Sequence, residues 1–204
     1  MRTEVKEFIE NNIDEIEREN FKPLYDRLSA MAFADFLNRS MVSNFTETLL
    51  GANIRPLEYL NYVPDFYLYR TSIPFKHLEL DTPLHHIGTL AFAFIGSLEE
   101  VTLNVLTVNA SAFLYCKSLK EIILKETTVI DAQAFSVCEK LEKVRLPATL
   151  KKIQHAAFRG DISLKEIVFE GTQSQWKRIM KDGWRDINPS PITIHCSDGS
   201  VIDI

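Results

Sequence analysis

Cysteine is scarce in this chain. Only three of its 204 residues are cysteines, namely Cys116, Cys138 and Cys196. An odd number without a C-x-x-C pair indicates neither a disulfide framework nor a zinc site. We therefore expect reduced thiols, as in the cytosol, and the sequence predicts no metal and no cofactor.

The chain also lacks the apolar stretches that membrane insertion or secretion requires. No run approaches the roughly 20 apolar residues of a membrane-spanning helix. The N-terminal stretch MRTEVKEFIENN mixes charged with apolar residues and has no continuous apolar core of a signal peptide. These features predict a cytoplasmic protein without a membrane partner.

Basic charge is the third deficit. The net charge is −5, with 23 Lys and Arg against 28 Asp and Glu. Residues 1–66 contain seven basic and twelve acidic residues, so the whole acidic excess lies there. Because phosphate-backbone binding usually needs a local basic excess, the sequence predicts no nucleic-acid partner.

What the chain does have is an internal repeat. Four segments follow the pattern I/V-x-x-x-A-F-x-x-C/I/D-x-x-L-x-x-V/I-x-L/F, and they are IGTLAFAFIGSLEEVTL (87–103), VNASAFLYCKSLKEIIL (108–124), IDAQAFSVCEKLEKVRL (130–146) and IQHAAFRGDISLKEIVF (153–169). Their phenylalanines are spaced by 21, 22 and 23 residues and are Phe92, Phe113, Phe135 and Phe158. A weaker unit precedes them, in which Tyr69, Phe75, Leu78 and Leu80 take the places of Phe92, Leu98, Val101 and Leu103.

Each unit has the pattern of a short strand and a corner. The V-x-L ending alternates apolar and polar residues, as a strand with one buried face does. The Ala-Phe pair is expected on a short helical turn, where Ala allows close approach and Phe fills the interior. No single unit can bury its apolar side, so the units are expected to stack at strand spacing, roughly 4.7–4.9 Å, around a common core.

The four units resemble the BspA-type leucine-rich repeat family, and the resemblance extends through FEGTQSQWKRIMKDGW and ITIHCSDG. It implies an α/β repeat fold: a leucine-rich-repeat solenoid of about five repeats with an N-terminal helical domain and a C-terminal helix-plus-hairpin cap. The expected divisions are a helical domain or cap (1–66), the repeats (67–170) and the C-terminal cap (171–204). Members of this family are generally binding modules, and the resemblance carries over no catalytic residue.

Outward strand positions form columns with one residue per repeat. One column alternates in sign and predicts a ladder of ion pairs between repeats: Lys76, Glu99, Lys120, Glu142 and Lys165. The next column is mostly acidic: His77, Glu100, Glu121, Lys143 and Glu166. The column on the open face of the sheet is the first candidate for partner binding: Glu79, Thr102, Ile123, Arg145 and Val168. Its apolar residues flank an arginine, a residue type enriched at interfaces, although ordinary strand-forming residues on a solvated face are the alternative.

Residues 1–66 lack the repeat and have helical patterns. The first helix is expected to carry an acidic stripe, which is the second candidate binding surface: Glu7, Glu10, Asp14 and Glu17. A second helix is expected to begin at Pro23, and a third to extend from Ser43 as N-cap to about Leu50, with Gly51 as C-cap. Two interpretations stay open, namely a cap over the first repeat and a partner-binding domain.

The C-terminal segment is expected to close the stack. A helix from Gln173 to Met180 would pack Trp176 and Ile179 over the last repeat. The alternating stretch ITIHCSDGSVIDI contains Asp198-Gly199, a dipeptide typical of hairpin turns.

Residues with catalytic chemistry are present but not grouped. His85 and His86 are adjacent, have no Cys or carboxylate at metal-ligand spacing, and are expected in a loop at a repeat corner. Cys116 and Cys138 fill one repeat position that holds Ile or Asp in other units, which indicates small buried residues rather than nucleophiles. No Walker loop, G-x-G-x-x-G, G-x-S-x-G or H-E-x-x-H occurs, so we expect a protein that is not an enzyme.

The sequence thus predicts a non-enzymatic protein–protein interaction module with an unidentified protein partner and no assigned oligomeric state. The resemblance to short bacterial or phage-type members of the family implies an inhibitor or adaptor acting on a host or phage protein. The alternatives are an acidic nucleic-acid-mimic inhibitor acting through the N-terminal helices, and a fragment of a cell-surface adhesin.

Overall fold

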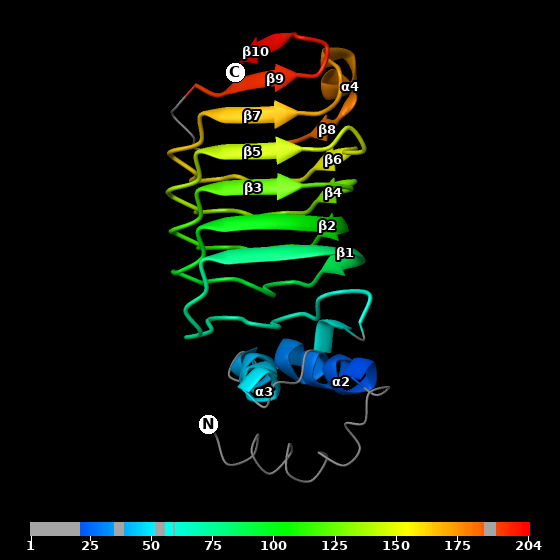
Figure 1. The fold of residues 1–204 in the computed structure, drawn as a ribbon, viewed down its shortest axis with the longest axis vertical. Coiled ribbons are helices and arrows are strands. Elements are labelled where there is room, and N and C mark those ends of the chain that lie inside the picture. Colours follow the sequence, from blue (N-terminus) through cyan, green and yellow to red (C-terminus); the bar gives the residue numbers. More distant parts are fainter. Residues whose placement is uncertain (1–20, 35–38, 52–55, 59, 186–190) are drawn as a thin grey trace.

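The computed structural model describes residues 21–34, 39–51, 56–58, 60–185 and 191–204. In this part the chain winds into a stack of parallel β-coils, with helices at the N-terminal end and a helix and a hairpin at the C-terminal end (Figure 1). The expected leucine-rich-repeat solenoid with these two kinds of end is confirmed. The predicted first helix, which would contain Glu7 to Glu17, lies outside the described residues.

Each coil contributes one strand to a parallel sheet that extends along the stack, here called the main sheet (Figure 1). Its strands are β1 (His77–Ile87), β2 (Glu100–Val108), β3 (Glu121–Leu124), β5 (Lys143–Leu146), β7 (Glu166–Phe169) and β9 (Thr193–Cys196), with β10 (Val201–Asp203) antiparallel on β9. The V-x-L alternation places every second side chain inward, and the register keeps these residues level from coil to coil.

A second, shorter face follows the main sheet around a corner. The C-terminal parts of β1 and β2 bend into this face, where β4 (Val129–Ile130), β6 (Lys152–Ile153) and β8 (Met180–Lys181) continue it. Between the main sheet and the shorter face, Thr102 and Val108 are 6 residues apart in the sequence. The residues paired with them are 7 apart in the next coil (123 and 130) and 8 apart in the one after (145 and 153). The increase in repeat spacing from 21 to 23 residues is therefore taken up here, where the added residues interrupt the strand.

The Ala-Phe corner consists of tight turns, so the expected helical turn is wrong. In each of the four units, the residues two before and two after the repeated Phe have a positive φ, for example 55° at Leu90 and 64° at Phe94. A right-handed helix does not contain such left-handed residues. Instead, corner N–H groups donate to carbonyls of the next coil, as from Phe92 to Ala112 at 2.8 Å. The corner thereby gains the coil-to-coil hydrogen bonding of a sheet.

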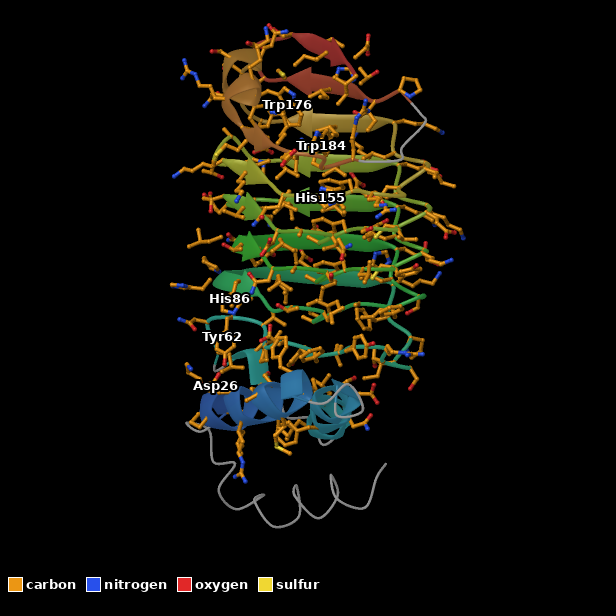
Figure 2. All side chains as sticks on the ribbon, turned by 180° about the vertical axis from the view of Figure 1, so that it is seen from behind. Asp26, Tyr62, His86, His155, Trp176 and Trp184 are labelled. Atoms are coloured by element: carbon orange, nitrogen blue, oxygen red, sulfur yellow. The ribbon has the colours of Figure 1, made fainter. Side chains whose placement is uncertain are left out.

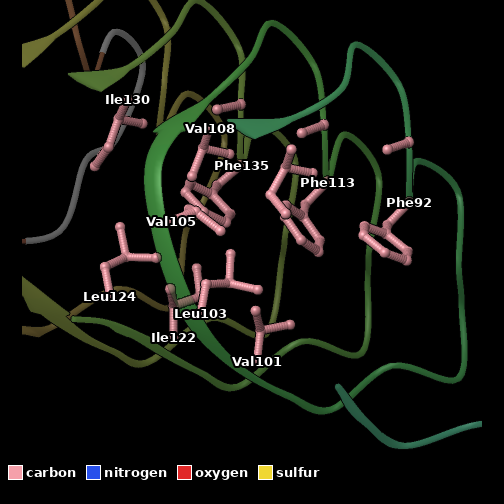
Figure 3. Close-up of a cluster of buried hydrophobic side chains, with 14 of the residues drawn as sticks. Phe92, Val101, Leu103, Val105, Val108, Phe113, Ile122, Leu124, Ile130 and Phe135 are labelled. Atoms are coloured by element: carbon pink, nitrogen blue, oxygen red, sulfur yellow. The ribbon is translucent and has the colours of Figure 1, made fainter. Parts of the chain in front are cut away.

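The repeated phenylalanines form one continuous column inside the stack, and Figure 3 shows Phe92, Phe113 and Phe135 of this column. The side chains of Phe92, Phe113, Phe135 and Phe158 are at most 1% exposed. In this order, the centroids of successive rings are 5.2, 5.3 and 5.5 Å apart, and the rings are stacked. Inward residues of the main sheet, such as Val101 and Ile122, close the core on the other side. Each such burial stabilises the fold by roughly 1.5–3 kcal/mol, so the stack is held by its interior.

The unit before Phe92 differs from the predicted alignment by one residue at its corner. Leu68 N–H donates to Ala91 O at 2.7 Å, as Phe92 N–H does one coil later, so Leu68 rather than Tyr69 is equivalent to Phe92. The ring that contacts Phe92 belongs to Tyr67, with centroids 6.1 Å apart. The strand positions Leu78 and Leu80 pair as predicted. One additional residue between corner and strand accounts for the shift.

Two helices cover the first coil: α2 (Phe21–Ala34) and α3 (Arg39–Gly51), followed by the short η2 (Pro56–Glu58). The Tyr25 ring contacts Phe45 of α3 at 5.5 Å and Tyr67 of the first coil at 5.8 Å, and its hydroxyl is hydrogen-bonded to Thr46 at 2.8 Å. The predicted N-cap at Ser43 is wrong, because α3 begins at Arg39 and Ser43 is buried within it. The helix therefore begins four residues before the cap signal in its sequence.

The coil-to-coil hydrogen bonds extend on both sides of the predicted repeat range. They begin at Asn61, whose carbonyl accepts from the His85 N–H at 2.7 Å, and continue through β8 and β9. The helix α4 (Gln173–Arg178) has a complete capping box between Thr172 and Gln175 and ends two residues earlier than predicted, because Met180 enters β8.

The C-terminal end is closed by aromatic side chains. Trp184 lies edge-on against Phe158, with centroids 5.8 Å apart, and Trp176 lies 6.2 Å from Trp184 (Figure 2). Beside them, Gly199 with a φ of 80° forms the turn of the predicted β9–β10 hairpin. The two tryptophans thus cover the end of the phenylalanine column.

Candidate functional site

The open-face column forms as the sequence predicts. The main-sheet register places the five predicted members of this column side by side, namely Glu79, Thr102, Ile123, Arg145 and Val168. His195 of β9 pairs with Val168 and extends the row by one residue. All of these side chains are partly or fully exposed, while the residues on either side along β2, β3, β5 and β7 are buried. Geometry therefore provides a continuous outward row in which Arg145 lies between two apolar β-branched residues.

The charged column beside it pairs only at its N-terminal end. Glu99 lies between Lys120 and Lys76, with carboxylate-to-Nζ distances of 2.5 and 2.8 Å. Hydrogen bonds from Lys120 and then Lys76 lower the pKa of Glu99 to about 2. Glu142 has no cation within 4 Å in the part of the chain that the structure describes, so the predicted five-membered ladder is wrong beyond Lys120. Lys120 is already engaged by Glu99 and does not reach both carboxylates.

The mostly acidic column contains two separate pairs. His77 lies 3.0 Å from Glu100, and Lys143 lies 3.1 Å from Glu166. Glu121 stands beside Glu100 in the register. The main-sheet face thus has paired charges along its margin and the open-face column in its interior.

Sequence reasoning missed an exposed aromatic edge at the corner. Phe94 and Tyr115 are 37% and 40% exposed, and their rings stack with centroids 5.2 Å apart and an interplanar angle of 4°. Arg70 lies over the Phe94 ring at 5.6 Å, and Lys117 over the Tyr115 ring at 5.8 Å. The sequence signal for Phe94 and Tyr115 was their shared position two residues after the repeated Phe, whereas Arg70 joins this column only once Leu68 is aligned with Phe92.

A polar cluster joins the helices to the first coils (Figure 2). The Tyr62 ring stacks on His86 with centroids 5.0 Å apart, and its hydroxyl donates to Asp26 of α2 at 3.2 Å. Burial lowers the pKa of His86, and burial raises the pKa of Asp65 against the hydrogen bond from Thr89. The predicted corner loop for His85 and His86 is wrong, since both residues lie on β1. The cluster connects α2 to β1 through stacking and one hydrogen bond.

The cysteines are buried thiols of the core. Cys116 and Cys138 are completely buried, and their thiols donate to the carbonyls of Phe92 and Phe113 at 3.2 and 3.4 Å. Burial raises the pKa of Cys116 to about 12, so the thiolate needed for a nucleophile is disfavoured. Among the residues the structure describes, no group of three His, Cys, Asp or Glu side chains could hold a metal ion.

The acidic stripe of Glu7, Glu10, Asp14 and Glu17 lies outside the described residues, so its binding role stays a prediction. Within the described ranges we find no helix with both the length and the hydrophobicity needed to span a bilayer.

Comparison with known proteins gives one family match. The profile of the BspA type leucine rich repeat region matches residues 61–180 in six copies. No curated protein matches the chain.

Two solved structures are similar. One is a leucine rich cell surface protein from Faecalibacterium prausnitzii, with 24% identity and a TM-score of 0.40 over 53% of this chain and 35% of that one. The other is a leucine-rich repeat protein from Bacteroides ovatus, with 18% identity and a TM-score of 0.43 over 66% of this chain and 45% of that one. The chain therefore spans less than half the length of either protein.

Proposed function

The chain belongs to the BspA-type leucine-rich repeat family, and from this premise we propose that it is a non-enzymatic protein-binding module whose partner binds the open face of the main sheet. The family match covers more than half of the chain and confirms the resemblance drawn from the four repeated units. Membership of this repeat family suggests a role in protein–protein interaction. The location of the binding surface on the main sheet is our own proposal.

The observation that carries the proposal is the row formed by Ile123, Arg145 and Val168. These residues are level in three adjacent strands, and each is partly exposed. Apolar side chains around an arginine provide both area and directional hydrogen bonding to a partner. In the exposed aromatic edge, Tyr115 precedes β3, the strand of Ile123, and Phe94 precedes β2, so we include this edge as an extension of the surface to be tested.

Site-specific photocrosslinking in the native host cell tests the proposal. A photoreactive amino acid is placed at Ile123, at Tyr115, and at Thr107, which is partly exposed on the shorter face and serves as the matched control. We expect a specific adduct from position 123, with or without one from position 115, and none from position 107. Adducts of equal yield from all three positions, or an adduct from position 107 alone, would contradict a binding role for the main-sheet face.

The finer part of the proposal is that binding inhibits the partner or recruits it as an adaptor does. Once crosslinking identifies the partner, its activity is measured with and without the full chain. Loss of activity with wild-type protein but not with Arg145→Glu supports inhibition. Unchanged activity with retained binding supports the adaptor role.

Two alternative functions have their own tests. A nucleic-acid mimic acting through Glu7, Glu10, Asp14 and Glu17 would lose its partner when these four residues are replaced by Gln, whereas Arg145→Glu would leave binding unchanged. A cell-surface adhesin would be found outside the cytoplasm. We propose a cytoplasmic location, which the three unpaired, buried cysteine thiols support. Fractionation of host cells with an antibody to the chain decides between these two locations.

A further inference from the structure

The main sheet has an open edge at β1, its strand nearest the helices (Figure 1). Lys76 O accepts hydrogen bonds from the N–H groups of Glu99 and Glu100 on the β2 side, at 2.7 and 3.0 Å. Successive peptide groups of a strand point to opposite sides, so the N–H and C=O groups of His77 and Glu79 point away from β2. Within the described residues, the first backbone hydrogen bond on this edge occurs only at His85.

An apolar groove of about 540 Å³ lies along this open edge. Its apolar lining includes Leu50 of α3, Leu57 of η2, Ile73, Phe75, Leu78 and Leu80. Leu78 and Leu80 are partly exposed, whereas their partners Val101 and Leu103 in β2 are 1% and 0% exposed. The first coil therefore lacks the cover that a preceding strand gives to every later one.

The size of the groove limits what can occupy it. Leu50 and Leu57 bring α3 and η2 to the side opposite β1, so the groove is bounded by helices and sheet together. A folded sheet that approached β1 edge-on would have to pass these elements. A single extended segment would not, because it needs only the width of one strand, about 4.8 Å, beside β1.

The charges at the rim indicate the sign of the occupant. Glu79 and Asp81 both point outward from β1, and Lys125 pairs with Asp81. Lys76 and His77 are already paired with Glu99 and Glu100. Two carboxylates thus share one ammonium group, and an added strand would meet a net negative charge opposite its outward side chains.

We propose that the open edge of β1 binds one extended segment of a partner protein in which apolar and basic residues alternate. The segment forms backbone hydrogen bonds with His77 and Glu79. Its apolar side chains enter the groove over Leu78 and Leu80, and a Lys or Arg lies opposite Glu79. This mode of strand addition gives affinity through the backbone and specificity through alternate side chains. The site includes Glu79 at the N-terminal end of the open-face column, but it does not include Ile123, Arg145 or Val168, on which the proposed binding face depends.

A fluorescein-labelled peptide of alternating leucine and lysine tests the proposal with the full chain. Binding is followed by fluorescence anisotropy, and amide hydrogen exchange at His77 and Glu79 is followed by NMR. We expect saturable binding, slower exchange at both amides, and about tenfold weaker binding to Glu79→Lys. Glu121→Lys makes the same charge change in β3, two strands further from the edge, and is expected to bind as wild type does.

Two control peptides separate strand addition from simple charge attraction. One has the same composition with leucines and lysines in separate blocks, and the other is N-methylated at alternate amides so that it cannot pair with an edge. Equal binding of either control peptide, or equal weakening of binding by Glu121→Lys, would overturn the proposal, as would absence of binding at millimolar peptide.

Two other occupants give distinct results. If Glu79→Lys abolishes self-association of the chain in sedimentation, a second copy occupies the edge and the proposal is overturned. If the peptide binds only to a full-length variant with Phe8→Glu and Ile9→Glu, the N-terminal segment of the chain itself is the occupant. Neither result bears on the crosslinking test at Ile123, so the two binding surfaces succeed or fail independently.

Discussion

At the scale of single residues, one repeat position shows how the stack tolerates chemical variation. The place filled by Cys116 and Cys138 in two units is filled by Asp161 in the last, and all three side chains are completely buried. The Asp161 carboxylate accepts a hydrogen bond from the Cys138 N–H at 2.7 Å. Burial nevertheless raises the pKa of Asp161 well above its ordinary value, because the hydrogen bond offsets only part of the desolvation.

The buried carboxyl predicts a pH dependence of stability. Because the pKa of Asp161 is higher in the folded protein, the unfolded chain loses this proton at a lower pH than the folded protein does. The free energy of unfolding therefore falls as pH rises above about 3.8, the ordinary pKa of an Asp carboxyl. Asp161→Asn keeps the oxygen acceptor without the charge. We expect the variant to melt about 2–4 °C or more above wild type at pH 8 and close to wild type at pH 4. Parallel melting curves across this range would contradict the expectation.

The phenylalanine column predicts a large difference between buried and exposed aromatic residues. Phe113 is stacked between Phe92 and Phe135 and is fully buried, whereas Phe94 is 37% exposed. Phe113→Ala should lower the free energy of unfolding by about 3–5 kcal/mol, since it leaves a cavity in a continuous core. Phe94→Ala is the matched control and should lower the free energy of unfolding by clearly less than Phe113→Ala does. Urea unfolding followed by circular dichroism measures both variants.

At the scale of elements, coil-to-coil alignment depends on backbone hydrogen bonds, and side-chain charges add to it only locally. The main sheet, the shorter face and the Ala-Phe corner all connect neighbouring coils by N–H to carbonyl hydrogen bonds. The charged column contributes at Glu99, where two lysines converge. Its alternating signs in sequence are therefore a poor guide to which pairs form.

The paired and unpaired glutamates of this column predict different effects. Glu99→Gln removes both ion pairs and should lower the melting temperature by about 1–2 °C at low salt, with the difference disappearing at high salt. Glu142→Gln changes the same column where no pair forms and should have no effect. Because the pKa of Glu99 is lowered to about 2, its contribution is present above pH 4.5 and is lost as pH falls towards 2. Equal effects of the two variants would show that Glu142 pairs in solution.

At the scale of the whole molecule, both ends of the stack are covered by elements that do not repeat. Tyr25 and Phe33 of α2 contact Tyr67 and Phe66 of the first coil, and Trp184 covers Phe158 at the other end. A solenoid exposes an apolar surface wherever such cover is missing. The groove beside β1 is the place where the N-terminal cover is incomplete.

Removal of the helices should therefore change the association state. A chain without residues 1–60 uncovers Phe66 and Tyr67, which are 0% and 3% exposed in the intact protein. We expect this chain to associate or precipitate, as measured by light scattering, while a chain lacking only residues 1–20 retains the state of the full protein. A monodisperse protein without residues 1–60 would show that α2 and α3 are not needed as a cap.

The sequence by itself determined the periodic part of this protein. Six or more repeated positions per unit predicted the solenoid, the phenylalanine column, the buried cysteines and the level open-face row around Arg145. These features could be predicted because each depends only on the strand alternation and on contact with the neighbouring coil. The V-x-L pattern gives the alternation, and the repeat spacing gives the residues that lie level in neighbouring coils.

Tertiary structure alone decided the features that depend on particular backbone or side-chain geometry. These features are the left-handed residues at the Ala-Phe corner, the alignment of Leu68 rather than Tyr69 with Phe92, and the start of α3 at Arg39. The corner is fixed by backbone hydrogen bonds to the next coil, which the side-chain pattern does not specify. Whether Glu99 or Glu142 pairs depends on which carboxylate a single lysine reaches. The groove beside β1 exists because helices, rather than another strand, lie next to this part of β1. The repeat pattern describes only the repeating units, so it could not predict this groove.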